Sequence, residues 1–445
     1  MKLKDKNVLV VGLGKTGLET AMFLYEKGAQ VRVSDMSTPE KLAKEIELLG
    51  PKGIEVESGG HTDETFLWAE LIVLSPGVPY TTPEVRKALK ENIEVISEVE
   101  LASIFITKPV IAVTGSNGKT TTCTLISEIL KKCGKKVFLG ANIGTPLISI
   151  ADRDSEYDVL VLELSSFQLQ GVYSFRPDIA VVLNISPNHL DHHESYTEYI
   201  ESKMKIAMNQ RSDDIFIYKS DDEEINNRLP RVKANKIPFG DALSENGISY
   251  NGCCVRYENE IYELSGMKLR GRHNIDNIMA AIAGTRALGC EPVQIKKAVI
   301  EFDPLPHRNE YLGEVRGAYF YNDSKSTSPG ATLSALESTR APVILIAGGK
   351  DKGVSYDALS NIVNEKVKVL VLIGEARQRM SEELGGNVRS IMADTLKGAV
   401  DSVLDNLEPR DSVLFSPACS SFDMFESYED RGRRFKEIVE NIRYS

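Results

Sequence analysis

The sequence predicts an α/β protein made of three consecutive α/β domains. Short apolar runs rich in β-branched residues recur along the chain, helix-length segments separate most of them, and glycine-containing turns follow several of them. At 445 residues the chain is longer than one hydrophobic core usually supports, so two or three domains are expected. We place the domains at residues 1–107, 108–306 and 307–445.

The first domain opens with a strand–helix–strand unit. Residues 8–11 predict a strand, residues 18–27 a helix, and residues 30–34 a second strand that ends at Asp35. Residues 71–74 predict a further buried strand, which Ser75-Pro76-Gly77 terminates.

Glycines 12, 14 and 17 form a Gly-x-Gly-x-x-Gly turn between the first strand and its helix. Such a turn leaves a helix N-terminus open to an anion, and an acid at the end of the next strand can accept a ribose or sugar hydroxyl. Alone, the pattern suggests NAD, and a uridine diphosphate meets the same description. The candidate substrate-binding residues here are Gly14, Lys15, Thr16, Asp35 and Ser75.

The second domain carries the most informative segment, residues 112–122, which follows an apolar run and opens a helical pattern. Its glycines let backbone N–H groups face phosphate oxygens, Lys119 adds a charge, and Thr120 offers a hydroxyl to Mg²⁺. Val113 stands where the full phosphate-loop pattern has glycine, which argues against an ordinary nucleotide-hydrolysing switch. The candidate nucleotide-binding residues are Gly115, Ser116, Asn117, Gly118, Lys119, Thr120 and Thr121.

Further charged residues follow the next strands, predicted at residues 110–113, 159–162, 179–183 and 215–217. Glu163 ends one strand, where α/β sheets present ligands, and we expect it to bind Mg²⁺ beside Thr120. His189 lies in a histidine-containing segment after another strand and is the preferred second metal or phosphate ligand. Residues 248–264 predict a pair of β-hairpins.

Lys203 is four residues after Tyr199 on a predicted helix, so the two share a face, whereas Lys205 points about 200° away from Lys203. A lysine among cations is unusual unless its charge is removed or reversed, and reaction with carbon dioxide would convert it to an anionic carbamate. A solvated helix face is the alternative that the residues leave open.

The third domain follows a predicted linker marked by Pro304, Pro306, Gly313 and Gly317. Residues 343–346, 369–373 and 413–415 predict strands that alternate with helical segments.

Composition excludes several classes of protein. A formal net charge of −11 and few basic runs argue against nucleic acid or an anionic membrane as partner. The six cysteines form no Cys-x-x-Cys pair, which fits a reducing compartment and argues against zinc. No stretch approaches the roughly 18 apolar residues of a membrane span. We therefore expect a soluble cytoplasmic protein.

Taken together and in order, the motifs resemble the Mur ligase family of ATP-dependent amide-bond synthetases. The resemblance covers nearly the whole chain and rests on these segments: Thr114-Gly-Ser-Asn-Gly-Lys-Thr120, Glu163-Leu-Ser-Ser-Phe-Gln168, Asn188-His-Leu-Asp191, Tyr199-x-x-x-Lys203, Gly271-Arg-His-Asn274 with Asn277, Pro306-His-Arg308, Asn322-Asp-Ser-Lys-Ser-Thr327 and Ser416-Pro-Ala-Cys-Ser-Ser-Phe-Asp423.

The resemblance implies an N-terminal Rossmann-like domain for a UDP sugar, a central phosphate-loop (P-loop) ATPase-type domain, and a C-terminal Rossmann-like domain for an amino acid. It assigns ATP phosphates and Mg²⁺ to Lys119 and Thr120, metals to Glu163 and His189, and carbamylation to Lys203. The remaining positions implied are Asn142 and Ser165 for the UDP substrate; Asn277, Arg308 and Asp323 for the nucleotide; and Lys325, Thr327, Lys352, Ser421 and Tyr428 for the amino acid.

Two departures concern the amino-acid pocket. Tyr428 stands where phenylalanine is expected, and either Lys350 or Lys352 aligns with the substrate lysine.

The implied reaction uses ATP and two Mg²⁺ ions to activate the carboxylate of UDP-N-acetylmuramoyl-L-alanine as an acyl phosphate. The amine of D-glutamate then displaces phosphate from it, which forms an amide. A monomer is expected. Addition of L-alanine, of a diamino acid, or of glutamate to folate are alternatives within the family. Outside it, an NAD-dependent dehydrogenase would explain Gly12 to Asp35 only, and a nucleotide-gated binding module would explain the phosphate loop only.

Overall fold

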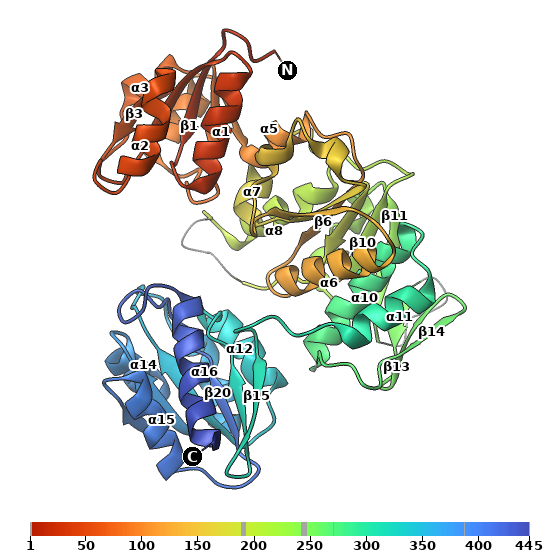
Figure 1. Ribbon diagram of the computed structural model, residues 1–445, viewed down its shortest axis with the longest axis vertical. Helices are drawn as coiled ribbons and strands as arrows, with labels where there is room; N and C mark the ends of the chain where they lie inside the picture. The colour runs from red at the N-terminus through yellow and green to blue at the C-terminus, as the bar shows by residue number, and fades with distance from the viewer. Residues whose placement is uncertain (1, 188–192, 242–246, 270, 387, 445) are drawn as a thin grey trace. The chain divides into compact units, whose positions relative to one another are not determined.

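Every apolar run predicted as a strand forms one in the computed structural model, which describes residues 2–187, 193–241, 247–269, 271–386 and 388–444. The described residues form three sheets (Figure 1). They divide into two units: Met1–Met267 with Asn274–Phe302, and Lys268–His273 with Asp303–Ser445. The first unit holds two of the sheets. Three α/β domains are therefore present, as predicted.

The N-terminal sheet has five parallel strands in the order β3-β2-β1-β4-β5. Parallel strands are covered on both faces, and the residues of β4 are correspondingly all buried. Its strands and helices are β1 (Asn7–Val11), α1 (Lys15–Glu26), β2 (Gln30–Asp35), α2 (Ala43–Leu49), β3 (Glu55–Ser58), α3 (Asp63–Trp68), β4 (Leu71–Leu74), α4 (Pro83–Lys90), β5 (Glu94–Ser97) and α5 (Glu98–Ser103).

The central sheet has nine strands in the order β14-β13-β12-β11-β10-β9-β6-β8-β7. Strands β12, β13 and β14 pair antiparallel, which confirms the predicted pair of hairpins. The strands are β6 (Val110–Thr114), β7 (Val137–Ala141), β8 (Val159–Glu163), β9 (Ile179–Val182), β10 (Ile215–Lys219), β11 (Asn235–Asp241), β12 (Ile248–Tyr250), β13 (Cys254–Tyr257) and β14 (Glu260–Glu263). The helices are α6 (Lys119–Lys132), α7 (Ser166–Gln170), α8 (Tyr196–Met204), α9 (Glu223–Asn226), α10 (Arg272–Ala287) and α11 (Pro292–Glu301).

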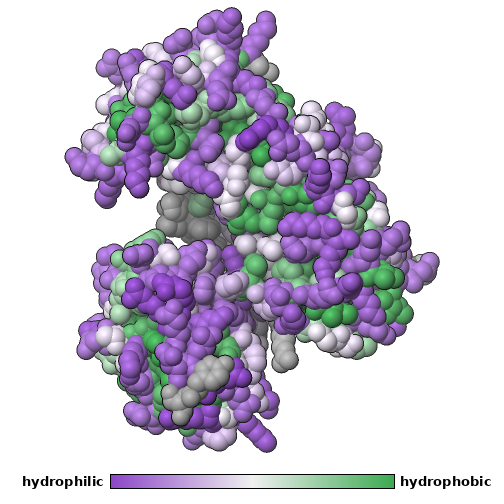
Figure 2. Space-filling model, viewed as in Figure 1, coloured by the Kyte–Doolittle hydropathy of each residue, from purple (hydrophilic) through white to green (hydrophobic). Residues whose placement is uncertain are grey.

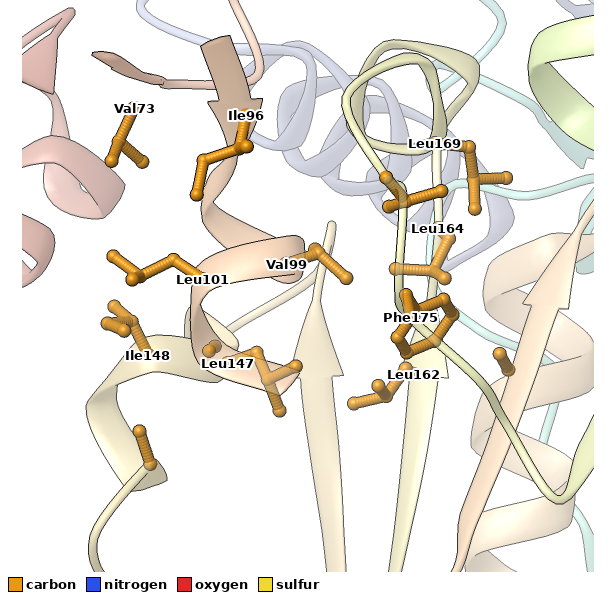
Figure 3. Close-up of a cluster of buried hydrophobic side chains, with 14 of the residues drawn as sticks. Val73, Ile96, Val99, Leu101, Leu147, Ile148, Leu162, Leu164, Leu169 and Phe175 are labelled. Carbon is orange, nitrogen blue, oxygen red and sulfur yellow. The ribbon is translucent and has the colours of Figure 1, made fainter. Parts of the chain in front are cut away.

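One apolar core runs through the first unit without a break between its two sheets. Figure 3 shows Val99 and Leu101 of α5 near Leu147 and Ile148, with Leu164 of the central domain beyond them. All five side chains are buried. Burial of this apolar surface holds the N-terminal and central domains together as one unit.

The C-terminal sheet has six strands in the order β15-β16-β20-β17-β18-β19, of which only β15 is antiparallel to its neighbour among the described residues. Apolar clusters cover both faces. Its elements are β15 (Glu310–Val315), β16 (Ala318–Asn322), α12 (Pro329–Ser338), β17 (Val343–Gly348), α13 (Ser360–Lys366), β18 (Val367–Ile373), α14 (Arg377–Leu384), β19 (Arg389–Met392), α15 (Leu396–Asp405), β20 (Ser412–Phe415) and α16 (Tyr428–Tyr444).

The predicted linker ending at Gly317 is wrong in its second half. Gly313 lies inside β15, where the pairing with β16 shifts register between Tyr311 and Gly313. The glycine marks a β-bulge in a strand rather than a flexible connection.

Hydrophilic residues cover most of the visible surface of each unit (Figure 2). None of the helices in the described ranges is long and apolar enough to span a membrane.

Candidate active site

The phosphate loop lies between β6 and α6, where the carboxyl end of a central strand meets a helix N-terminus. Contacts from the segment after β9 fix it: Asn117 N–H donates to Asn184 Oδ1 (2.9 Å), and Ser116 Oγ donates to the Ser186 carbonyl (3.0 Å). These bonds hold the loop in one shape, so that its remaining N–H groups can face an anion.

Gly118 is required by its surroundings. Its φ is +84°, and a Cβ atom there would lie 2.3 Å from Asn277 Oδ1. Asn277 is buried on α10 and also accepts a hydrogen bond from Thr122 Oγ1 (3.2 Å). The structure thus brings Asn277, a predicted nucleotide residue, directly against the phosphate loop.

Two lysines converge on the loop through one acceptor. Lys119 Nζ donates to the Gly115 carbonyl (2.7 Å) and to the Ser116 carbonyl (3.0 Å), and Lys203 Nζ donates to the same Gly115 carbonyl (2.9 Å). The Lys203 residue is 2% exposed. Burial first, and then the charge of Lys119, hold the pKa of Lys203 well below its usual range, while Glu163 opposes the shift.

Tyr199 supports Lys203 from the same face of α8. Its ring centre is 4.7 Å from Lys203 Nζ, and its hydroxyl is 2.8 Å from Ser116 Oγ. Lys205 instead donates to the Gln170 carbonyl. The two lysines therefore diverge, as the helical period predicts.

Glu163 ends β8 and is 3% exposed. Its Oε1 accepts from Asn142 Nδ2 (2.8 Å), and its Oε2 is buried with no hydrogen-bond partner among the described residues. A buried carboxylate oxygen of this kind fits a hard cation, because oxygen is the ligand that Mg²⁺ prefers. Within those residues no three His, Cys, Asp or Glu side chains gather into a metal cluster. His189 lies outside the described residues.

Ser165 follows this strand and caps α7. Its hydroxyl accepts from Gln168 N–H (3.3 Å), and the Gln168 side chain accepts in return from Ser165 N–H (3.1 Å). This capping box fixes Ser165 at the start of α7, directly after the end of β8.

Side chains that follow neighbouring strands form hydrogen bonds with the N-terminal glycine turn. The Asp35 carboxylate accepts from Leu13 N–H (2.6 Å) and Ser37 N–H (2.6 Å), and Ser75 Oγ donates to the Gly12 carbonyl (2.8 Å). Lys15 Nζ donates to the Gly144 carbonyl of the central domain (2.9 Å). Gly14 is the N-cap of α1, and Thr16 lies in its first turn. The structure therefore gives Asp35 a structural task besides the predicted one.

In the second unit, Asp323 organises the end of β16. Ser416 Oγ (2.8 Å) and Ser326 Oγ donate to its carboxyl group, as does Asn309 N–H (3.1 Å). Burial raises the pKa of Asp323 to about 6, against these hydrogen bonds and the charge of Arg308.

The predicted amino-acid residues lie at the same sheet edge, since they follow β16, β17 and β20. Lys325 Nζ lies over the Tyr428 ring, 3.9 Å from its centre. Lys350 Nζ is paired with Glu375 (2.7 Å), and Lys352 is exposed. Ser421 is buried, and Thr327 is partly buried between β16 and α12. Both lysines are exposed, and Lys350 differs in having an ion pair with Glu375, so Lys352 is the better candidate for a ligand contact.

Sequence reasoning missed two residues of these sites. Asn184 orients the phosphate loop, and Arg431, which is fully buried, donates to Ser324 Oγ (3.0 Å) and to the Ser324 and Cys419 carbonyls. The burial of Arg431 could not be predicted from the sequence, because an arginine on a charged helix usually faces solvent.

Three family models match the chain, as the N-terminal domain of MurD-like Mur ligases over residues 6–97, the Mur ligase middle domain over residues 113–285, and the Mur ligase glutamate ligase domain over residues 307–419. The chain belongs to the Mur ligase family. This confirms the predicted family and its three-domain α/β architecture.

Relatives within the family are similar over the whole chain. The UDP-N-acetylmuramoylalanine–D-glutamate ligase of Citrifermentans bemidjiense is 46% identical over 444 residues, covering 99% of this chain and 98% of that protein. The protein of the same name from Acidobacterium capsulatum is 42% identical, over 99% of this chain and 97% of that protein.

Solved Mur ligases share the fold at lower identity. MurF ligase from Thermotoga maritima in complex with ADP has a TM-score of 0.60 and 19% identity, covering 99% of this chain and 96% of that one. MurC from the same organism has a TM-score of 0.58 and 19% identity, covering 98% and 99%.

Proposed function

We propose that this Mur ligase adds D-glutamate to UDP-N-acetylmuramoyl-L-alanine with conversion of ATP to ADP and phosphate. The substrate carboxylate takes the γ-phosphoryl group and becomes an acyl phosphate. The D-glutamate amine then attacks the acyl carbon, and phosphate leaves as the amide bond forms. The reaction would supply a peptidoglycan precursor in the cytoplasm.

The observation that carries the proposal is full-length identity of 42–46% to proteins named for this reaction. The glutamate ligase model over residues 307–419 supports the choice of amino acid. We assign UDP-sugar binding to residues 1–107, ATP binding to residues 108–306, and amino-acid binding to residues 307–445.

The phosphate-loop residues Gly115 to Thr121 would hold the ATP phosphates, and Lys119 would neutralise charge that develops on the transferred group. Asn277, Arg308 and Asp323 would contact the nucleotide. Gly14, Lys15, Thr16, Asp35, Ser75, Asn142 and Ser165 would bind the UDP substrate, and Lys325, Thr327, Lys352, Ser421 and Tyr428 the amino acid.

Thr120, Glu163, His189 and modified Lys203 would hold two Mg²⁺ ions, which when bound neutralise phosphate charge. Glu163 supplies the strongest support for this set of ligands, because its buried Oε2 has no hydrogen-bond partner among the described residues.

We also propose that Lys203 carries a carbamate. An amine attacks carbon dioxide only when uncharged, and burial beside Lys119 favours the uncharged form of Lys203. The nitrogen forms a bond to carbon, one C=O bond becomes C–O⁻, and the nitrogen releases a proton. The product is an anion next to Lys119.

The test is phosphate release from ATP and Mg²⁺ by the full chain with UDP-N-acetylmuramoyl-L-alanine. D-glutamate, L-glutamate, L-alanine and a diamino acid are added in separate wells. The proposal expects release only with D-glutamate, together with a mass gain of one glutamyl residue on the UDP sugar. Phosphate release with another amino acid would contradict the proposed specificity for D-glutamate. No phosphate release in any well would contradict the proposed reaction.

A further inference from the structure

A short loop of the central domain, residues 140–148, contacts three parts of the first unit. It begins at the end of β7, and Ala141 N–H closes it by donating to the Thr145 carbonyl (2.9 Å). Ala141 has a φ of +76°, a conformation that an alanine keeps only where surrounding contacts hold it. The loop is therefore shaped by its neighbours and not by its own backbone preference.

Two of these contacts lead to the candidate active site. Asn142 holds Glu163 through its side chain (Nδ2 to Oε1, 2.8 Å) and its backbone N–H (to the Glu163 carbonyl, 2.9 Å). Two residues later, the Gly144 carbonyl accepts from Lys15 Nζ at the N-terminal glycine turn (2.9 Å). A shift of the loop would move a metal-ligand candidate and a UDP-substrate candidate together.

The third contact is Glu98 of α5. It is 1% exposed, and its Oε1 accepts from Ile148 N–H at 2.6 Å, where the loop ends. In Figure 3 the side chains of Leu147 and Ile148 lie beside those of Val99 and Leu101 on α5. Burial in this apolar cluster raises the pKa of Glu98 to about 7. Its carboxyl oxygen is the acceptor for the Ile148 N–H, and removal of that oxygen leaves a buried N–H unsatisfied.

We propose that Glu98 is a positioning residue for the ligase reaction: by fixing Ile148 it sets the 140–148 loop, and through the loop it sets Asn142 and Gly144. This inference rests on the proposed function. It assigns a role at the site to a residue that is not among the proposed substrate or metal ligands.

Glu100, two residues further along α5, provides the matched comparison. Its carboxylate is also buried and accepts from the N–H groups of Tyr173 (3.0 Å), Ser174 (2.7 Å) and Phe175 (3.0 Å). These residues lie outside the 140–148 loop and outside the site. Both glutamates thus join α5 to the central domain, and only Glu98 reaches the loop.

The experiment compares wild type, Glu98→Met, Glu98→Gln and Glu100→Met as full chains in the D-glutamate-dependent ligase assay. Methionine keeps the volume and removes the acceptor, and glutamine keeps one acceptor oxygen. We expect Glu98→Met to lower kcat/KM for the UDP substrate about tenfold, the loss of roughly one buried hydrogen bond. We expect Glu98→Gln to recover it to within about threefold, and Glu100→Met to lower only Tm.

Wild-type kcat/KM in folded Glu98→Met would overturn the inference, as would equal losses of kcat/KM in Glu98→Met and Glu100→Met, since those indicate general destabilisation. If Glu98→Met does not fold, Glu98→Asp replaces it with the same expectation, because a carboxylate shorter by one methylene is drawn away from Ile148 N–H. A wild-type chain without D-glutamate-dependent phosphate release would instead overturn the proposed function and, with it, this role.

Discussion

Gly118→Ala tests whether the phosphate loop and Asn277 form one unit. The new Cβ would lie 2.3 Å from Asn277 Oδ1 and 3.3 Å from Leu183 Cδ1. Asn277 is 3% exposed and bonded to Thr122 and Asn274, so it cannot turn away freely. The left-handed backbone should cost about 1–2 kcal/mol and overpacking about 1–3 kcal/mol. We expect a total loss of about 2–5 kcal/mol.

Gly134→Ala is the control at the other end of the same helix. Gly134 has a φ of +79°, and a Cβ there meets nothing within 4 Å. It should therefore lose only the backbone contribution, about 1–2 kcal/mol. Calorimetric Tm and the KM for ATP separate the two variants. Gly118→Ala should raise the KM for ATP at least about tenfold, and Gly134→Ala should leave it unchanged. Equal Tm losses with an unchanged KM for ATP in both would refute the reasoning.

Three further predictions concern single side chains. Lys203→Ala should abolish phosphate release, and added short-chain carboxylic acids should partly restore it; an unmodified Lys203 in the mass spectrum of the active enzyme would contradict the carbamate. Tyr428→Phe should keep the KM for D-glutamate, because the ring under Lys325 remains, whereas Tyr428→Ala should raise it; equal effects would dismiss the ring contact. Burial raises the pKa of Asp323 from 3.8 to about 6, so the folded chain holds a proton that the unfolded chain releases. That stabilisation, on the order of 3 kcal/mol, is present below about pH 4 and lost as pH rises through about 6. The Tm of wild type should therefore fall relative to Asp323→Asn over this interval, and parallel Tm curves would contradict the assignment.

The strands that the sequence predicts and those that it misses differ in where they lie. Central strands such as β1, β6 and β17 are covered on both faces and appear as continuous apolar runs. Five of the missed strands, β3, β5, β7, β15 and β19, lie at sheet edges. Four of these five carry polar or charged residues that break the pattern, as in Glu55–Ser58, whereas β7 (Val137–Ala141) does not. The sequence analysis also missed β11 and β16, although neither lies at a sheet edge.

The candidate site divides in a similar way. Each motif at the end of a strand could be placed from sequence, because strand ends follow directly from the strands. Contacts between distant segments could not, because no local pattern encodes them. Asn277 Oδ1 and Gly118 come together only when α10 packs on α6, and Glu98 meets Ile148 only when the two domains share their apolar core.

Helical periodicity predicts the direction of the Lys203 side chain, whereas its charge depends on how the side chain is packed. The helical period predicts which way Lys203 points, and the structure agrees, with Tyr199 on the same face. The helical period does not predict which groups pack around that side chain. Both Lys203 and Lys119 donate to the Gly115 carbonyl, and Lys119, which is only partly buried, also donates to the Ser116 carbonyl. Burial first, and then the nearby charge of Lys119, favour the uncharged form of Lys203. Lys203 is more buried than Lys119, so we expect Lys203 to be the lysine that carries the proposed carbamate.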